Sequence, residues 1–332
     1  MKEYKIVVQG TRKIIAYLEQ NINIPNKIFY FSKQSTSYFK KIKKADVVVT
    51  MSWGKTMWGG TNKLDIPKTE NLKLIHLPGS GIDAIDFRQV PHNCKVCNVY
   101  EHEIPIAEFC VGSMLNWEIK LIEKTSKFKK LDWSDCIIFD GPTHNELSDK
   151  TIGILGYGKI GKEIAKRIKP FGVKIYGYSR IPRKKDKYLN EIFLSRSLKE
   201  TIKQLDYLII ACPLTDITKN LINKSTLNLM KESAVIINIA RGGIINEKDL
   251  YNALKSKKIG GAIIDTWFKY PNSKDQKNFK PSSYSFNNLR NVIMSPHISA
   301  WSENMISRRS KVISENINRL YLKKKLNNIV KF

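Results

Sequence analysis

The sequence predicts an α/β protein built from two doubly wound parallel-sheet domains, and three observations support this. The chain has 332 residues, of which 42% are apolar, which is enough for two buried cores. Short apolar stretches alternate with helical patterns before residue 102 and again after residue 150. A glycine-rich turn joins a strand to a helix at the start of the second series. Because alternating strands and helices form parallel sheets covered on both faces, each series predicts one such sheet.

The first series occupies the first hundred residues. The expected strands are 5–9, 27–31, 46–50, 72–77 and 96–99, and the expected helices are 11–20 and 35–44. The amino terminus is charged and then apolar for a few residues, so we expect a strand there rather than a signal peptide. The apolar runs are too short for a membrane span, so no membrane contact is expected.

The second series begins at residue 151. The expected strands are 151–155, 174–178, 207–211, 235–239, 261–265 and 292–294. Apolar residues at helical spacing predict one long helix from 103 to about 128, which would bridge domains or form a subunit contact. Residues 129–150 are expected to form a loop, and 302–324 an amphipathic helix.

Charge and cysteine content narrow the function classes. The formal net charge of +27 is compatible with binding of nucleic acid or with a composition that is rich in lysine throughout. Because the lysines are scattered, we favour the second explanation, in which the positive field attracts anionic small molecules. The five cysteines include one C-x-x-C pair, Cys94 and Cys97, with no second pair at metal-site spacing. We therefore expect free thiols, no metal and a reducing, cytoplasmic location.

The glycine-rich turn predicts a dinucleotide site. Gly156 permits a tight turn after strand 151–155, Gly158 lets the backbone approach a pyrophosphate, and Gly161 lets the next helix pack against the strand. Lys159 and Ile160 open that helix, whose free N–H groups favour phosphate. The alternative is an ordinary glycine-rich connection.

The end of the next strand indicates which dinucleotide is bound. An NAD enzyme would place a carboxylate there for the ribose 2′-hydroxyl, but this chain has Ser179 and Arg180, followed by Arg183. A hydroxyl and nearby cations suit a 2′-phosphate instead. We therefore expect NADP, with NAD still possible. The alternative is that these cations simply coat a solvated loop.

Four further segments carry a resemblance to a known family. They are 77–83 (LPGSGID), 238–245 (NIARGGII), 261–267 (GAIIDTW) and 295–299 (SPHIS). Together with the glycine turn, and in this order, they resemble the D-isomer-specific 2-hydroxyacid dehydrogenases. That family includes glyoxylate/hydroxypyruvate reductases, phosphoglycerate dehydrogenases and formate dehydrogenases.

The resemblance implies a domain arrangement and an assembly. A Rossmann cofactor domain, 102–298, would be inserted into a flavodoxin-like substrate domain formed by 1–101 and 299–332. The family usually dimerises through its cofactor domain, and the expected apolar helix 103–128 fits a homodimer. The resemblance also places residues beside the cofactor, namely Cys212, Pro213, Ala240 and Asp265.

The chemistry of 2-keto acid reduction gives roles to the motif residues. The planar fork of Arg241 suits the substrate carboxylate and the developing alkoxide, and His297 can donate the proton because it titrates near neutral pH. The loop Gly79-Ser80-Gly81 resembles the family's carboxylate-binding loop. Trp53, Trp58 and Trp301 would either wall the substrate pocket or belong to the core.

One position departs from the family pattern. Most members have a glutamate directly before the proline of the Asp265 segment, where it charges the histidine, and this chain has Tyr270. A tyrosine can hydrogen-bond an imidazole but cannot raise its pKa by charge. We expect a pKa of His297 near or below about 6.5, with reduction favoured at mildly acidic pH. Glu303 is the alternative partner.

Three functions remain open. The first is an NADP-dependent reductase of a small 2-keto acid such as glyoxylate or hydroxypyruvate. The second is a formate-type oxidation, which needs no general acid and whose family members also lack the glutamate. The third is a dinucleotide-sensing binding protein without catalysis, against which the presence of Arg241 and His297 argues.

Overall fold

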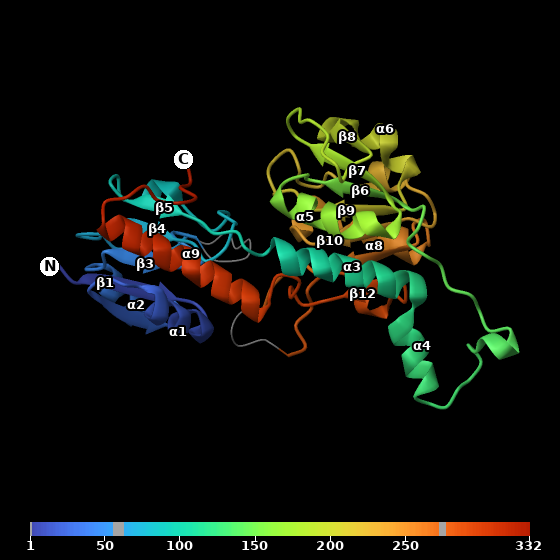
Figure 1. Ribbon diagram of the computed structural model, residues 1–332, viewed down its shortest axis with the longest axis horizontal. Coiled ribbons are helices and arrows are strands. Elements are labelled where there is room, and N and C mark those ends of the chain that lie inside the picture. Colours follow the sequence, from blue (N-terminus) through green and yellow to red (C-terminus); the bar gives the residue numbers. More distant parts are fainter. Residues whose placement is uncertain (1, 56–62, 272–276) are drawn as a thin grey trace. The chain divides into compact units, whose positions relative to one another are not determined.

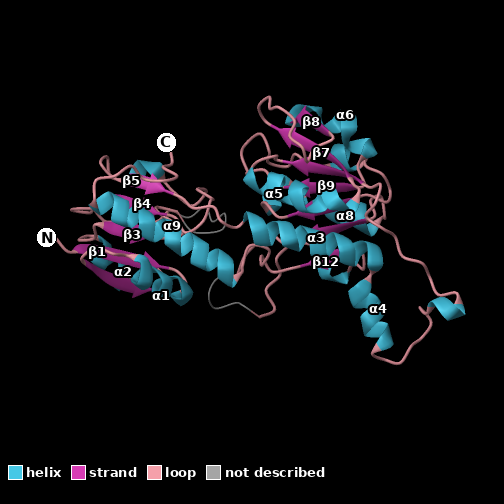
Figure 2. Ribbon diagram, in the orientation of Figure 1, coloured by secondary structure: helices cyan, strands magenta, loops and turns pink. Residues whose placement is uncertain are grey.

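The computed structural model describes residues 2–55, 63–271 and 277–332. It divides into two units, of which unit 1 comprises residues 1–101 and 301–332, and unit 2 comprises residues 102–300 (Figure 1). Each unit holds its own parallel sheet between helices, so the predicted fold class is confirmed (Figure 2). Along the chain, unit 2 lies between the two segments of unit 1.

Unit 1 contains a parallel sheet with the strand order β2-β1-β3-β4-β5. The strands are β1 (Tyr4–Gln9), β2 (Asn26–Phe31), β3 (Val47–Val49), β4 (Leu74–His76) and β5 (Lys95–Cys97), and the helices are α1 (Arg12–Asn21), α2 (Thr36–Ile42) and α9 (Glu303–Tyr321). Alternate residues of β1 face opposite cores. Ile6 and Val8 pack with residues of α1 and α9, whereas Val7 packs with residues of α2. This burial on both faces explains why the strands read as continuous apolar runs.

Unit 2 contains a parallel sheet with the strand order β12-β11-β10-β9-β6-β7-β8. The strands are β6 (Thr151–Leu155), β7 (Lys174–Ser179), β8 (Glu191–Leu194), β9 (Tyr207–Ile210), β10 (Val235–Asn238), β11 (Gly261–Ile264) and β12 (Val292–Met294). The helices are α3 (Glu103–Ile119), α4 (Leu121–Phe128), α5 (Lys159–Ile168), α6 (Leu198–Thr201), α7 (Lys224–Leu227) and α8 (Glu247–Lys255). Helices α3 and α5 pack together on one face of the sheet, and α6, α7 and α8 contribute to the core on the other.

The sequence-based assignment of one long helix over 103–128 is wrong. Lys120 takes a left-handed conformation with φ of 58°, which ends α3 and redirects the chain into α4. The Asn116 side chain stabilises this break, because its amide oxygen accepts the Ile122 N–H at 3.1 Å. Residues 121–139 therefore lead away from the sheet of unit 2 (Figure 1). The edge strand β8 was not predicted either.

Candidate active site

The three glycines of the turn after β6 each meet a different steric demand. Gly156 has φ of +101°, and a Cβ there would lie 2.5 Å from the Cys212 amide nitrogen. A Cβ at Gly161 would lie 2.7 Å from the Gly156 carbonyl oxygen, so α5 approaches the turn closely. At Gly158 nothing lies within 4 Å of a Cβ position, which leaves the turn open to an incoming group.

This turn lies where the sheet topology predicts a nucleotide site. β6 pairs with both β7 and β9, so the order of strands reverses at β6, and ligands bind at the carboxyl ends of strands at such a point. Helix α5 begins at Lys159 and has no side-chain cap at its amino end, where phosphate oxygens are favoured. The open Gly158 position and this helix end fit a dinucleotide pyrophosphate. Cys212 is buried beside the turn, and Pro213 after it is exposed.

The end of β7 presents no carboxylate. Ser179 is the last residue of β7 and is buried, while Arg180 and Arg183 in the following loop are exposed. The structure therefore places these three predicted cofactor residues at the carboxyl edge of the sheet that also carries the glycine turn.

The Arg241 segment follows β10 and is braced locally. The Asn238 side chain donates to the Arg241 carbonyl at 3.1 Å and accepts the Ala240 N–H at 3.1 Å. The guanidinium Nη1 of Arg241 donates to the Ala240 carbonyl at 2.8 Å. A Cβ at Gly242 would lie 2.4 Å from the Trp267 carbonyl oxygen, so only glycine lets this segment pack against the one that follows β11.

Asp265 holds the His297 segment. It is fully buried, and its Oδ1 accepts from the Ser295 hydroxyl at 2.6 Å and from the Ile298 N–H at 2.8 Å. Its Oδ2 accepts from the Ser299 N–H at 3.0 Å. These bonds flank His297 on both sides along the chain. Asp265 thus positions the histidine, in addition to the cofactor contact that remains a prediction.

His297 and Tyr270 are in direct contact. His297 follows β12 with φ of +59°, a backbone region that residues other than glycine seldom adopt. Its Nδ1 lies 2.9 Å from the Tyr270 hydroxyl, which also accepts the Trp267 N–H at 3.1 Å. The alternative partner proposed from the sequence, Glu303, accepts hydrogen bonds from Lys13 and Tyr17 within unit 1.

The pKa of His297 is lowered from its ordinary value, in the direction expected from the sequence. Burial is the largest cause, the Asp265 carboxylate opposes it, and the Arg241 cation acts in the same direction as burial. Arg241 therefore lies within electrostatic reach of the imidazole. Burial also raises the pKa of Tyr270, so its hydroxyl stays protonated.

The predicted carboxylate loop lies in unit 1. Its carbonyl groups are bound internally, because Gly79 accepts from the Val99 N–H at 3.1 Å and Ser80 accepts from the Asn98 side chain at 3.0 Å. Gly81 is exposed. Of the three tryptophans, Trp53 is fully buried in the core of unit 1, Trp301 is 51% exposed, and Trp58 lies outside the described residues.

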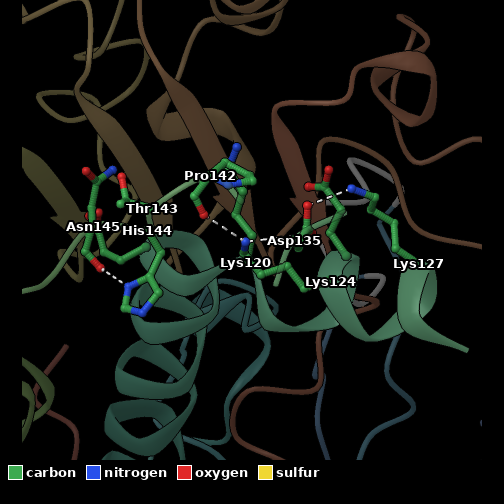
Figure 3. A pocket seen from close by; sticks show the side chains of 10 residues that line it. Lys120, Lys124, Lys127, Asp135, Pro142, Thr143, His144 and Asn145 are labelled. Carbon is green, nitrogen blue, oxygen red and sulfur yellow. Dashed lines mark hydrogen bonds and ion pairs between the residues drawn. The ribbon is translucent and has the colours of Figure 1, made fainter. Parts of the chain in front are cut away.

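A polar cavity of about 250 Å³ lies elsewhere in unit 2, at the base of the 121–139 segment (Figure 3). Two of its lining cations are paired: Lys127 is 2.7 Å from an Asp135 carboxylate oxygen, and Lys124 donates to the Pro142 carbonyl at 3.3 Å. The cavity shares no lining residue with the predicted site.

In unit 1, the C-x-x-C thiols are buried, which raises the pKa of both Cys94 and Cys97 to about 12 and makes them unreactive.

Two contributors to the site were not predicted from the sequence. The Asn238 side chain makes two hydrogen bonds within its own segment, whereas the Ser295 hydroxyl reaches Asp265 on the neighbouring strand end. Polar residues at the carboxyl ends of buried strands were the available signal, since such residues rarely lack a partner.

None of the helices among the described residues is both long and apolar enough to cross a bilayer.

Comparison with known proteins places this geometry in a family context. The sequence model of the D-isomer specific 2-hydroxyacid dehydrogenase, NAD binding domain, matches residues 111–299. The D-3-phosphoglycerate dehydrogenase of Methanocaldococcus jannaschii is 33% identical over 293 residues, which cover 88% of this chain but about half (52%) of that protein. The hydroxypyruvate reductase of Thermotoga maritima is 33% identical over 264 residues, which cover 79% of this chain and 80% of that protein. The solved structure of a 2-hydroxyacid dehydrogenase from Ketogulonicigenium vulgare shares the fold, with a TM-score of 0.80 and 19% identity over 100% of this chain and 99% of that one.

Proposed function

Because this chain belongs to the D-isomer-specific 2-hydroxyacid dehydrogenase family, we propose that it is an NADPH-dependent reductase of a small 2-keto acid, of the size of glyoxylate or hydroxypyruvate. The observation that carries the proposal is the cluster of Arg241, Tyr270 and His297 at the carboxyl ends of neighbouring strands. These strands belong to the sheet that carries the glycine turn. The Gly79-Ser80-Gly81 loop of unit 1 is proposed to bind the substrate carboxylate.

In this proposal each side chain has one task. Arg241 binds the keto acid through its guanidinium and stabilises negative charge on the carbonyl oxygen as it becomes an alkoxide. His297 in its imidazolium form donates the Nε2 proton to that oxygen. A dinucleotide whose pyrophosphate is held by Gly156, Gly158 and the amino end of α5 would supply the hydride. The cofactor contacts assigned to Lys159, Ile160, Cys212, Pro213 and Ala240 belong to the same proposal.

Tyr270 can bond Nδ1 of His297 in either protonation state of that nitrogen. After Nε2 has given up its proton, the neutral histidine must carry its hydrogen on Nδ1. The Tyr270 oxygen has two lone pairs, one for the Trp267 N–H and one for an Nδ1–H. A tyrosine can also donate to Nδ1, unlike a carboxylate, so Tyr270 positions the ring without charging it.

The proposal is tested with purified protein, NADPH or NADH, and a panel of 2-keto acids, followed by absorbance of the reduced nicotinamide. We expect oxidation of NADPH with glyoxylate or hydroxypyruvate. Reduction of the oxidised cofactor by formate alone would instead support the formate-type reaction, which the missing glutamate motivates. Tight cofactor binding without turnover of any substrate would support a sensing protein.

The cofactor preference gives the first prediction. We expect Ser179→Asp to lower the ratio of kcat/KM for NADPH to that for NADH at least about tenfold, since a new carboxylate would repel a 2′-phosphate with an energy of about 1.4 kcal/mol or more. Steady-state kinetics with both cofactors measure this ratio. Ser283→Asp, an exposed position in the same unit, is the matched control. An unchanged ratio in Ser179→Asp would refute the assignment of NADP.

The pH dependence gives the second prediction. Reduction needs protonated His297, so kcat/KM should be constant at low pH and fall as pH rises through the pKa of the free enzyme. Because burial lowers that pKa, the fall should begin below about pH 6.5. Tyr270→Glu should move it upward by about one unit or more, through attraction between the carboxylate and the imidazolium. Identical profiles for the two proteins would show that residue 270 does not act on His297.

We further propose a cytoplasmic homodimer that associates through unit 2. Large apolar side chains between residues 121 and 139 are exposed: Leu121, Ile122, Phe128, Leu131, Trp133, Ile137, Ile138 and Phe139. Such a concentration of exposed apolar surface is typical of a protein interface. Sedimentation should give twice the chain mass, and Ile137→Lys combined with Ile138→Lys should give monomers. A monomeric wild-type protein at micromolar concentration would contradict the proposal.

A further inference from the structure

The basic loop after β7 is the part of unit 2 that the proposed function leaves unexplained in structural terms. Its cations Arg180, Arg183, Lys184 and Lys185 are exposed. A solvated loop of this kind loses conformational entropy when it orders around a ligand, which weakens binding. In this structure, hydrogen bonds to Tyr157 of the glycine turn hold the carboxyl-terminal end of the loop in place.

Asp186 is the fastening residue. Both of its carboxylate oxygens accept from the Tyr157 hydroxyl, at 2.9 and 3.0 Å, and Oδ1 also accepts the Tyr188 N–H at 3.1 Å. The Lys162 ammonium on α5 lies 3.6 Å from Oδ2. The carboxylate is therefore satisfied by groups of the glycine turn and its helix, and its charge is balanced by Lys162.

Tyr157 is the second residue of the glycine motif, between Gly156 and Gly158. It is buried, and its ring packs so closely on β7 that a Cβ at Gly177 would lie 3.1 Å from its Cγ. Burial, together with the Asp186 carboxylate, raises the pKa of the Tyr157 phenol. The phenol therefore stays protonated and donates, so that the turn and the loop are joined by a buried side chain.

A second anchor lies four residues further on. The Asn190 side-chain oxygen accepts the Ile175 N–H of β7 at 2.9 Å and the Lys169 ammonium at 3.0 Å. Lys185 donates to the Asn190 carbonyl at 3.0 Å. Ser179 is fixed in β7 before residues 180–185, and Asp186 and Asn190 are fixed by hydrogen bonds after them. Residues 180–185, called the 180–185 arch below, therefore form a short loop that is anchored at both ends.

We infer that Tyr157 and Asp186 are positioning residues for cofactor choice, which hold the 180–185 arch ready for the 2′-phosphate monoester of an adenosine ribose. The inference rests on the proposed use of NADP. By this inference, the preference for a 2′-phosphate depends on the anchoring of the 180–185 arch by Tyr157 and Asp186 as well as on the positive charges of the arch. In this inference Asp186 acts through its hydrogen bonds to Tyr157 and the Tyr188 N–H.

The test uses the full chain and two probes that lack the nicotinamide, adenosine 2′,5′-bisphosphate and adenosine 5′-monophosphate, with Kd measured by calorimetry. Tyr157→Phe removes the hydroxyl and keeps the buried ring. We expect it to weaken binding of the bisphosphate about three- to tenfold, the range of ordering a mobile segment, and to leave the monophosphate within about twofold. Asp186→Asn should act in the same direction. Tyr176→Phe removes a hydroxyl on β7 that donates to the Gln204 side chain, and serves as the matched control.

A second measurement reports on the loop itself. Trypsin should cut after Arg183, Lys184 or Lys185 faster in Tyr157→Phe than in the wild-type or Tyr176→Phe protein, as followed by mass spectrometry of the fragments. Cleavage rates that are equal in all three proteins would overturn the inference.

The results of the binding measurements distinguish a failure of this inference from a failure of the proposed use of NADP. If Tyr157→Phe weakens both probes equally or neither, the inference fails while the NADP assignment stands. Tighter bisphosphate binding by Asp186→Asn would place the carboxylate beside the ribose and would also overturn it. A wild-type protein that binds both probes equally would refute the NADP assignment and this inference together. The keto-acid assay, which can use either cofactor, is independent of all these results.

Discussion

Removal of the His297 imidazole is expected to lower kcat for keto-acid reduction about 10²- to 10⁴-fold, the usual contribution of a positioned general acid. His297→Asn is the sharpest variant. Asparagine tolerates the left-handed backbone that His297 adopts, so the segment held by Asp265 should stay in place. The amide cannot titrate, so the fall of the rate with rising pH should disappear with the activity.

The controls for His297 distinguish chemistry from folding. His92→Ala removes an exposed histidine of unit 1 and should leave turnover unchanged. The Kd of His297→Asn for NADPH should stay close to that of the wild-type protein, because the glycine turn is untouched. A variant that keeps wild-type kcat would show that the proton comes from another group or from water.

Loss of the Arg241 guanidinium should lower kcat/KM for a 2-keto acid about 10³-fold, because in the proposed mechanism one cation serves both the substrate carboxylate and the charge that develops on the carbonyl oxygen. Arg241→Lys should recover part of this loss, since lysine keeps the charge but not the planar fork. Steady-state kinetics of Arg241→Ala and Arg241→Lys, with Arg290→Ala as an exposed control, measure both effects.

Arg241 should also change the pH profile, which a purely structural residue would not do. Its cation lowers the pKa of His297, so the residual activity of Arg241→Ala should persist to higher pH than that of the wild-type protein. A profile that stays in place would mean that the two side chains do not interact in solution. Near-normal kcat/KM in Arg241→Ala would refute its proposed role in binding the keto acid.

Sequence patterns predicted the parts of the fold that depend on local periodicity. Buried strands such as β1 and β10 are continuous apolar runs because helices cover both faces of each sheet. The edge strand β8, whose residues are exposed or half-buried, was not predicted. The break at Lys120 escaped prediction because it depends on one hydrogen bond, from the Ile122 N–H to the Asn116 side-chain oxygen, inside an otherwise helical pattern.

The candidate site was predictable as far as its motifs reach. The glycine turn, Arg241 and His297 occupy strand ends that the pattern identifies, and the Tyr270 contact with His297 was expected from the departure at that position. The bond between Tyr157 and Asp186 was not predictable, since the two residues are 29 positions apart. Such contacts arise when the sheet brings separate strand ends together, and no spacing rule encodes them.

The left-handed backbone conformation of His297 lowers the stability of the fold relative to glycine at the same position. A left-handed conformation costs a histidine roughly 1 kcal/mol relative to glycine, and the buried Asp265 bonds compensate for it. Mutational drift toward a more stable chain should therefore favour glycine or asparagine at this position, and each such change would remove the proposed proton donor. If His297 is the proton donor, only selection for catalysis would favour histidine over these residues at position 297.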